Sequence, residues 1–346
     1  MRVLVIEKDL SRHIRDVPEP EIKAYEAKCK ILACGLCGSD KKFLSGVPFA
    51  KAPPISYPLV LGHESVGEVV EVGAHVRKFK VGDIVSGPLL RFAAGYDMAW
   101  GGFSEYGTVL DEGAAGYAGE KADLIRYLAQ RHTVLPDWLA PKQGPMLGVM
   151  RETLGAIRHF GMDAGQSIVV YGLGPIGMAF VRFLSIKGLA PIIAIDIVDE
   201  KVKRAKDFGA DYAFNANDPD LEKKILDICP KGVNHVLDGV GIPEAWDNMI
   251  PLLGENAQLA IFGVAAAKGG MVNWDLRKYW NFRLNFFQMT QPGDDNWAHN
   301  QVLALIKAGA INLDDYIAGY FPFDDILSVL DQFMNNAFQK KPIITF

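Results

Sequence analysis

Short stretches of alternating apolar and polar residues fill the first 110 positions of the chain. They are rich in β-branched residues, and Gly, Pro or Asp separates one stretch from the next. The clearest examples are residues 1–7 (MRVLVIE), 25–35 (YEAKCKILACG), 64–73 (ESVGEVVEVG), 82–87 (GDIVSG) and 103–110 (FSEYGTVL). Regularly spaced short strands are typical of a barrel or a sandwich. The pattern therefore predicts a β-rich first domain.

From about residue 150 the pattern changes to continuous apolar runs that alternate with helical periodicity. The runs are typical of strands that are buried on both faces. Strands are expected at residues 165–172 (GQSIVVYG), 191–198 (PIIAIDIV), 235–241 (HVLDGVG) and 258–264 (QLAIFGV), with helices at 175–189 and 200–210. This alternation predicts an α/β domain built on a doubly wound parallel sheet.

The last fifty or so residues do not continue this alternation, so we assign them to the first domain. They read as a helix at 296–309, a short strand at 316–323, a helix at 324–336 and a closing strand at 341–346. Residues 111–133 form an unusual insertion, with a loop and then helical spacing over 120–131. We therefore expect a first domain over 1–149, a second over 150–290, and a segment over 291–346 that returns to the first.

Composition narrows the class of protein. The chain has 346 residues, 49% of them hydrophobic and 22% charged, which excludes wholesale disorder. A formal net charge of −5 argues against nucleic acid as the main partner. No stretch approaches 18 uninterrupted apolar residues, and the N-terminus lacks the pattern of a signal peptide. We expect a soluble, cytoplasmic protein that does not insert into a membrane.

A glycine-rich motif follows the first strand of the second domain. Its residues, Gly172, Leu173, Gly174, Pro175, Ile176 and Gly177, fit the G-x-G-x-x-G pattern of dinucleotide-binding loops. The first glycine permits the tight turn, the second lets a pyrophosphate approach, and the third lets helix and strand pack closely. The N-terminus of the following helix offers free N–H groups to the phosphates. We expect these six residues to bind a dinucleotide.

Asp196 ends the next expected strand, 19 residues after Gly177. An acidic residue at this place accepts hydrogen bonds from the adenosine ribose and repels a 2′-phosphate. Lys201 and Arg204 follow closely and would tolerate such a phosphate. We favour NAD over NADP because of the carboxylate, and we count Lys201 among the cofactor-binding residues.

A second set of chemically active residues lies in the first domain. Cys37 follows an expected strand in GLCGSD, and His63 and Glu64 come about 26 residues later in GHE. Cysteine, histidine and glutamate are the ligand types of a catalytic zinc site with one open position. Taken singly, Cys37 and His63 are better explained by buried structural roles than by metal binding. Cys34 and Cys37 also form a C-x-x-C pair, although a cytoplasmic disulfide would be unusual.

Together these motifs resemble the zinc-dependent medium-chain dehydrogenases, and most of all the branch of sorbitol and other sugar-alcohol dehydrogenases. The matching segments are GLCGSD, PLVLGHESVGEVVEVG, the later VGD, and GLGPIG with its downstream Asp. The resemblance covers nearly the whole chain. It implies a GroES-like catalytic domain joined to a Rossmann domain, with the active site in the cleft between them.

The resemblance also assigns roles. Cys37 and His63 match zinc ligands, and Glu64 matches a ligand or close neighbour. Ser39 matches the hydroxyl that hydrogen-bonds the alcohol, so the catalytic set is Cys37, Ser39, His63 and Glu64. Asp40 matches a group that orients a ligand.

Two departures from the family pattern affect the metal prediction. The stretch GPLLRFAAGYDMAWGGFSEY has no cysteine where the family often holds a structural zinc, so we expect one catalytic zinc per chain and no structural one. The family usually supplies a further Cys or Glu ligand where this chain has Gly148. Helical spacing would let Glu152, four residues later, lean back over Gly148. We therefore count Glu152 among the expected metal ligands, with an ion pair to Arg151 or Arg158 as the alternative.

The sequence thus predicts an enzyme that moves a hydride between a secondary alcohol and NAD, giving a ketone. The expected substrate is a small polyol, sugar or sugar derivative, and the expected assembly is a homodimer or homotetramer. Two alternatives remain open: a zinc-free, NADPH-dependent medium-chain reductase, and a non-catalytic NAD-binding redox sensor. The segment WDLRKYWNFRLNFF interleaves basic and aromatic residues, and we expect an inner strand or a subunit edge there.

Overall fold

The computed structural model describes residues 1–47, 56–90, 95–113, 128–264, 272, 274 and 281–346. Contacts between residues divide the chain into two compact units. Unit 1 comprises Met1–Gly148 and Leu313–Phe346, and unit 2 comprises Val149–Asn312. The chain therefore leaves unit 1, builds unit 2, and returns.

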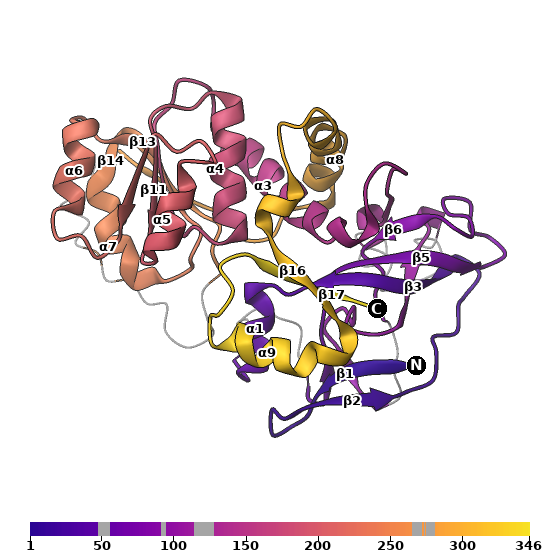
Figure 1. Ribbon diagram of the computed structural model, residues 1–346. Coiled ribbons are helices and arrows are strands. Elements are labelled where there is room, and N and C mark those ends of the chain that lie inside the picture. Colours follow the sequence, from indigo (N-terminus) through magenta and orange to yellow (C-terminus); the bar gives the residue numbers. More distant parts are fainter. Residues whose placement is uncertain (48–55, 91–94, 114–127, 265–271, 273, 275–280) are drawn as a thin grey trace. The chain divides into compact units, whose positions relative to one another are not determined.

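Unit 1 is built on two sheets (Figure 1). The smaller sheet has the order β2 (Arg12–Asp16), β1 (Arg2–Ile6), β4 (Leu59–Val60) and β7 (Asp97–Met98). The larger has the order β16 (Ile317–Pro322), β17 (Lys341–Thr345), β3 (Glu26–Gly35), β5 (Glu64–Val72), β6 (Ile84–Ser86) and β9 (Thr133–Val134), with β8 (Tyr106–Leu110) also paired to β3. Short strands at regular spacing are what the alternating pattern predicts.

The central position of β3 follows from its sequence. Six of its ten residues are apolar, and its last three, Ala33, Cys34 and Gly35, are all buried. The strand pairs antiparallel with β5 and β8, and its end pairs with β17. The C-terminal strand thus lies beside a strand from the start of the chain. Helices α1 (Gly38–Leu44) and α9 (Ile326–Met334) bury Phe43, Leu330 and their neighbours in the core beside these strands.

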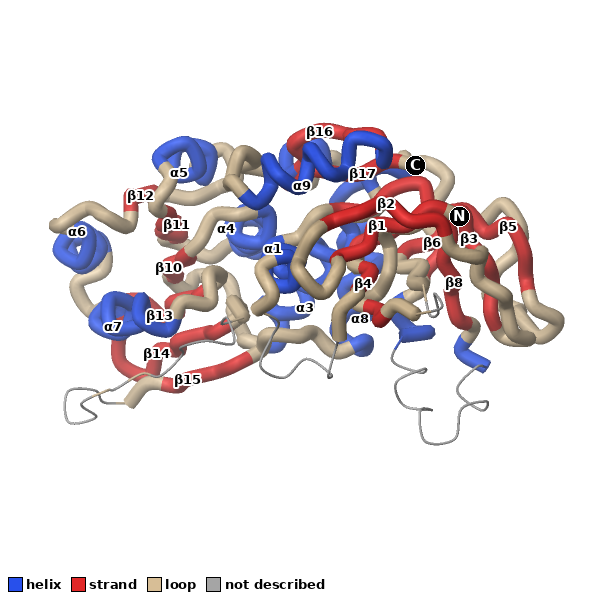
Figure 2. The backbone as a smooth tube through the Cα atoms, turned by 90° about the horizontal axis from the view of Figure 1, so that it is seen from below, coloured by secondary structure: helices blue, strands red, loops and turns tan. Residues whose placement is uncertain are grey.

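Unit 2 contains a parallel sheet with helices on its two faces. The strand order is β12 (Tyr212–Asn215), β11 (Ile192–Asp196), β10 (Ile168–Tyr171), β13 (Val233–Asp238), β14 (Leu253–Ile261) and β15 (Arg283–Phe286). Figure 2 shows the strands in a row, with α6 (Leu221–Ile228) and α7 (Trp246–Met249) on the side opposite α4 (Pro175–Lys187). Every residue of β10 and β11 is buried, as their continuous apolar runs predict. The α/β class and the doubly wound sheet are confirmed.

Three further α-helices and five short 3₁₀ turns lie in the described part of the chain. Helix α3 (Met146–His159) connects the two units along the chain, and α5 (Asp199–Ala205) and α8 (Pro292–Lys307) belong to unit 2. Short 3₁₀ turns cover Pro141–Gln143, Pro243–Ala245, Ile250–Leu252, Leu313–Tyr316 and Phe323–Asp325. No helix in the described part of the chain is long and apolar enough to cross a bilayer.

The place where the chain returns to unit 1 differs from the expectation. We expected residues 291–346 to return together, but α8 lies in unit 2 and the return begins at Leu313. The reason is close packing: a side chain on Gly155 of α3 would lie 3.0 Å from Cβ of Asp294 on α8. Arg182 of α4 also donates two hydrogen bonds, of 2.8 and 2.6 Å, to the carbonyl of Ala310.

Two expected segments are only partly visible. Most of the helical stretch over 120–131 lies outside the described residues, as does most of the insertion over 111–133. In WDLRKYWNFRLNFF the described part forms β15, which pairs with β14 at the edge of the described sheet. Because β15 ends the described sheet, it is not an inner strand there, and the interpretation of this segment as a subunit edge stays a prediction.

Candidate functional site

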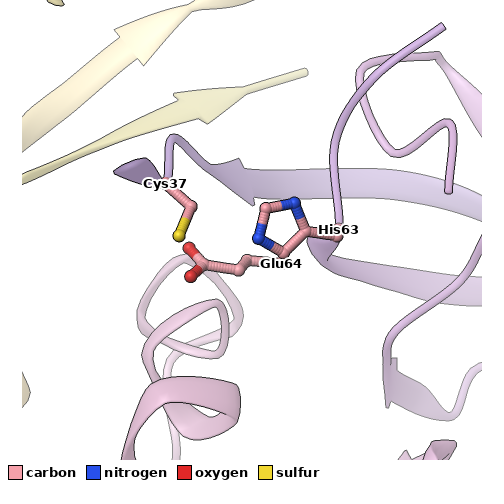
Figure 3. Close-up of side chains that lie close together, drawn as sticks. All are labelled: Cys37, His63 and Glu64. Atoms are coloured by element: carbon pink, nitrogen blue, oxygen red, sulfur yellow. The ribbon is translucent and has the colours of Figure 1, made fainter. Parts of the chain in front are cut away.

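Three side chains in unit 1 converge on one point. Among the described residues, Cys37, His63 and Glu64 are the group whose metal-binding atoms all lie within 4.8 Å of one another. Figure 3 shows the Cys37 sulfur and the Glu64 carboxylate pointing toward each other, with the His63 ring beside them. One sulfur, one nitrogen and one carboxylate form a donor set suited to a catalytic zinc ion with an open position. The residues present therefore fit the metal that the sequence predicts.

Local backbone structure explains why these side chains meet. Cys37 is the N-cap of α1 and lies two residues after Gly35, the end of β3. Glu64 begins β5, and the β3–β5 register pairs it with Gly35. Gly62 has a φ of +105°, and a Cβ there would lie 2.5 Å from the backbone nitrogen of Phe103. Only glycine allows this close, left-handed turn, which brings His63 and Glu64 to the end of β3.

Asp40 ties two of the three residues together. Its side chain is 1% exposed, and Oδ2 accepts a hydrogen bond of 2.8 Å from the backbone N–H of Cys37. Its other oxygen lies 3.3 Å from Nδ1 of His63. Burial opposes a charge on the imidazole, but Asp40 and Cys37 outweigh it and hold the pKa of His63 well above its usual value. With Nδ1 facing Asp40, Nε2 is the nitrogen that a metal would bind.

Lys341 is a member of this site that the sequence analysis missed. It is 3% exposed, and its Nζ lies 2.5 Å from Oε2 of Glu64 and donates to the carbonyl of Leu36 at 3.2 Å. Burial alone would lower the pKa of Lys341, but Glu64, Cys37 and Asp40 raise it above its usual value. The available signal was a lysine at the head of an otherwise apolar closing strand, KPIITF.

Ser39 and Trp100 lie beside the metal-binding group. The Ser39 hydroxyl is 3.8 Å from the sulfur of Cys37. The Trp100 ring centroid is 5.3 Å from that of His63, and its backbone has a φ of +69°. A tryptophan rarely adopts this left-handed conformation, and such strain tends to persist at functional sites. Ser39 and Trp100 thus lie next to Cys37 and His63, respectively.

Gly148 stands where the family usually has a further metal ligand, and Glu152 is the residue expected to replace that ligand. Both lie on α3, and a Cβ added at Gly148 would meet nothing within 4 Å. Glu152 falls in unit 2 and is not a member of the Cys37–His63–Glu64 group. Its role as a ligand stays a prediction.

Other cysteines in unit 1 are poor metal ligands. Cys29 and Cys34 are fully buried, and burial raises the pKa of Cys29 to about 12 and that of Cys34 well above its usual range. Since a metal binds the thiolate, this burial disfavours ligation. Cys37 is partly exposed.

The glycine-rich loop in unit 2 has the geometry that each glycine was expected to allow. Gly172 has a φ of +90°. A side chain on Gly177 would collide with the carbonyl of Gly172, so the third glycine permits the close approach of α4 to the loop. Gly174 caps α4, Pro175 begins it, and a Cβ on Gly174 would meet nothing within 4 Å. That open position at a helix N-terminus suits a pyrophosphate.

Asp196 holds this loop through hydrogen bonds to its backbone. The residue is 8% exposed, and its carboxylate accepts backbone N–H bonds from Leu173 at 2.7 Å and Val198 at 2.9 Å. Lys201 lies 3.6 Å from the same carboxylate. The Leu173 N–H is therefore already used within the protein. The neighbouring Ile197 is 66% exposed, which leaves an apolar surface beside the carboxylate.

Two models of known protein families match this chain, one within unit 1 and one within unit 2. A model of the alcohol dehydrogenase GroES-like domain matches residues 23–117, and a model of zinc-binding dehydrogenases matches residues 175–305. (R,R)-butanediol dehydrogenase of Bacillus subtilis is 30% identical over 244 residues, covering 68% of this chain and 69% of that protein. Sorbitol dehydrogenase of Bombyx mori is 26% identical over 335 residues, covering 94% and 93%. Among solved structures, galactitol-1-phosphate dehydrogenase from Escherichia coli matches all of both chains with a TM-score of 0.82 and 23% identity.

Proposed function

Because the chain belongs to the zinc-dependent medium-chain dehydrogenase/reductase superfamily, as an alcohol dehydrogenase acting on CH–OH groups, we propose that it oxidises a secondary alcohol of a polyol, sugar or sugar derivative to a ketone with NAD. The observation that carries the proposal is the convergence of Cys37, His63 and Glu64. The polyol class rests on the relatives that act on butanediol and sorbitol.

Cys37, His63 and Glu64 would hold a single zinc ion, and Asp40 would keep Cys37 and His63 in place. When bound, zinc supplies Lewis acidity at the substrate oxygen and NAD supplies the hydride acceptor. Ser39 would accept the hydroxyl proton of the substrate and pass it outward, since its hydroxyl lies beside Cys37 and is partly exposed. Trp100 would border the substrate on the His63 side.

The residues that we expect to bind the cofactor, and to favour NAD over NADP, all lie in unit 2. The loop 172–177 and the N-terminus of α4 would receive the pyrophosphate, and Asp196 would accept hydrogen bonds from the ribose hydroxyls. Ile197 and Val240, which are 66% and 44% exposed, follow strands on either side of β10 and offer apolar surfaces for adenine. Lys201 partly offsets the charge of Asp196 and would weaken the preference for NAD without reversing it.

A homo-oligomer is also part of this proposal. Strand β15 lies at the edge of the described sheet, and its Leu284 and Phe286 are 40% and 51% exposed. Met289, just beyond the strand, is 62% exposed. An edge strand with exposed apolar side chains is prone to pair with another chain. We place the contact with a second copy at β15.

Replacing Cys37 tests the central assignment. Cys37→Ser should abolish oxidation across a panel of polyols and sugar alcohols, because the site loses its sulfur ligand. NAD binding, followed by titration, should stay within about threefold of the native value, since the dinucleotide residues lie in unit 2. Full turnover in the variant would refute the metal assignment. Lost NAD affinity in a folded variant would refute the separation of the two sites.

Two substitutions with opposite expected effects on the preference for NAD over NADP test the cofactor assignment. The native protein should prefer NAD by at least about tenfold in kcat/KM, or about 1.4 kcal/mol. Asp196→Ala should narrow that ratio, whereas Lys201→Ala should widen it because the Asp196 charge is no longer offset. Steady-state kinetics with both cofactors provide the measurement. Equal use of NADP by the native protein would show that Lys201 or Arg204 dominates.

The fourth ligand is tested at Glu152 and Gly148 together. If Glu152 binds the metal or its water, Glu152→Ala should weaken zinc affinity or turnover by roughly 10–100-fold, the usual cost of losing such a group. Gly148→Glu, which enters open space, should restore both in the Glu152→Ala background. Unchanged affinity and turnover in Glu152→Ala would leave a three-residue site, with Glu152 in an ion pair to Arg151 or Arg158.

A further inference from the structure

Asp238 is a fully buried carboxylate in unit 2, at the carboxyl end of β13. Its Oδ1 accepts hydrogen bonds from the backbone N–H groups of Val240 at 2.8 Å and Gly241 at 2.9 Å, and its Oδ2 accepts one from Nε1 of Trp246 at 2.8 Å. A buried carboxylate is costly unless such donors compensate it. The carboxylate therefore ties the indole of Trp246 to the loop over residues 239–241.

The loop over 239–241 lies next to the glycine-rich loop. Tyr171, the last residue of β10, pairs with Asp238 in the parallel register, and the N–H of Gly239 donates a hydrogen bond of 2.9 Å to the carbonyl of Tyr171. From β10 the chain continues to β11 on one side and later reaches β13 on the other, so the strand order reverses here. In open α/β sheets, ligands bind at the carboxyl ends of the strands at such a point.

Val240 brings this loop into contact with the expected cofactor site. A Cβ added at Gly172 would lie 2.6 Å from Cγ2 of Val240, so the valine packs directly against the first glycine of the motif. On its other side the loop packs against the residues that follow β14, because a Cβ added at Gly241 would lie 2.6 Å from the carbonyl oxygen of Val264. Any shift of the loop would therefore move the exposed part of Val240 relative to the glycine-rich loop.

Trp246 determines how the Asp238 carboxylate is turned. The indole is 6% exposed, belongs to the hydrophobic core beside the parallel sheet, and makes an edge-to-face contact with Phe286 at 5.7 Å between ring centroids. The terminal torsion of an aspartate has only broad preferences of its own. Because the fixed indole engages Oδ2, Oδ1 is left to accept both N–H groups of the loop. The position of the loop therefore follows that of the indole.

Resting on the proposed dinucleotide site, we propose that Trp246 is a positioning residue for the cofactor. Through Asp238 it holds the loop over 239–241, so that Val240 stays beside the glycine-rich loop and forms a wall for the adenine half of the dinucleotide. Because the indole is buried and Asp238 accepts its N–H, Trp246 acts only through that carboxylate. The effect falls on cofactor affinity, and it leaves the choice between NAD and NADP to Asp196.

Trp246→Phe tests this role because it keeps an aromatic ring in the core and removes the N–H donor. The full-length protein is titrated calorimetrically with NAD and with ADP, which carries the adenine half alone. Both affinities should fall at least about fivefold, since a buried carboxylate oxygen loses its partner and the loop shifts. The KM for NAD should rise by a similar factor while kcat at saturating NAD stays within about twofold, as expected when only binding is weakened. The preference for NAD over NADP should not change.

Three further variants control this test. Trp274→Phe should leave both affinities unchanged, although Nε1 of Trp274 also donates to an aspartate, Asp247, at 3.0 Å on the exposed surface. Asp238→Asn should weaken ADP binding at least about fivefold, because its amide sets a second donor against the indole N–H. In the double variant Trp246→Phe/Asp238→Asn no buried charge remains and the amide oxygen still accepts from the loop. Its loss of ADP affinity should therefore be smaller than the product of the two single losses.

The outcomes separate this inference from the function on which it rests. Native ADP affinity in Trp246→Phe would overturn the role of Trp246 while leaving the proposed function intact. A fall in kcat with an unchanged KM for NAD, an equal loss in Trp274→Phe, or single losses that simply multiply in the double variant would also overturn it. If the native protein binds neither ADP nor NAD, both the proposed function and this inference fail. If Trp246→Phe does not fold, native ADP affinity in Asp238→Asn overturns the inference.

Discussion

The register in which β17, β3 and β5 pair is the constraint on which the candidate metal centre depends. It aligns Ile343, Gly35 and Glu64 across three strands and carries Lys341 to the side of Cys37. A slip of one residue in any of these pairings would turn Glu64 or Lys341 to the opposite face of the sheet. The buried apolar residues of β3 and β17 fix the register, so the hydrophobic core of unit 1 also determines the arrangement of charges at the site.

Buried charged residues of opposite sign also face one another at the candidate metal centre. Asp40 accepts a hydrogen bond from the backbone N–H of Cys37 and faces His63, and Lys341 faces Glu64. Cys37, His63 and Glu64 therefore each have a buried partner that orients them. Such partners are expensive to bury without their counterparts and are usually maintained where a metal must be held in a defined geometry. In unit 2 the carboxylate of Asp196 has a comparable position, because it fixes the glycine-rich loop through Leu173.

Local patterns predicted much of this architecture. Alternation identified the strands of unit 1, and continuous apolar runs identified β10 and β11, because burial on one or two faces leaves a direct trace in the sequence. The glycine-rich motif and the Cys37, His63 and Glu64 set were found because their spacing is local or follows a known family pattern. The ligand roles of these three residues and of Glu152 remain predictions.

What local patterns could not predict depends on contacts between distant segments. Lys341 reaches the site only through strand pairing between residues some 300 positions apart. The boundary at Leu313 rather than 291 depends on the packing of α8 against α3, where Gly155 accommodates Asp294. The hydrogen bond from Leu173 to Asp196 likewise requires the relative placement of two strands. None of these contacts leaves a periodic signal in the sequence.

The central claim is that one metal centre, built from Cys37, His63 and Glu64, serves this chain. The most direct test is elemental analysis of the full-length protein purified without added metal. The account predicts one zinc per chain, lost when the protein is dialysed against a chelator. Two zincs per chain would contradict the absence of a structural site, and no zinc even after the metal is added back would contradict the metal centre itself.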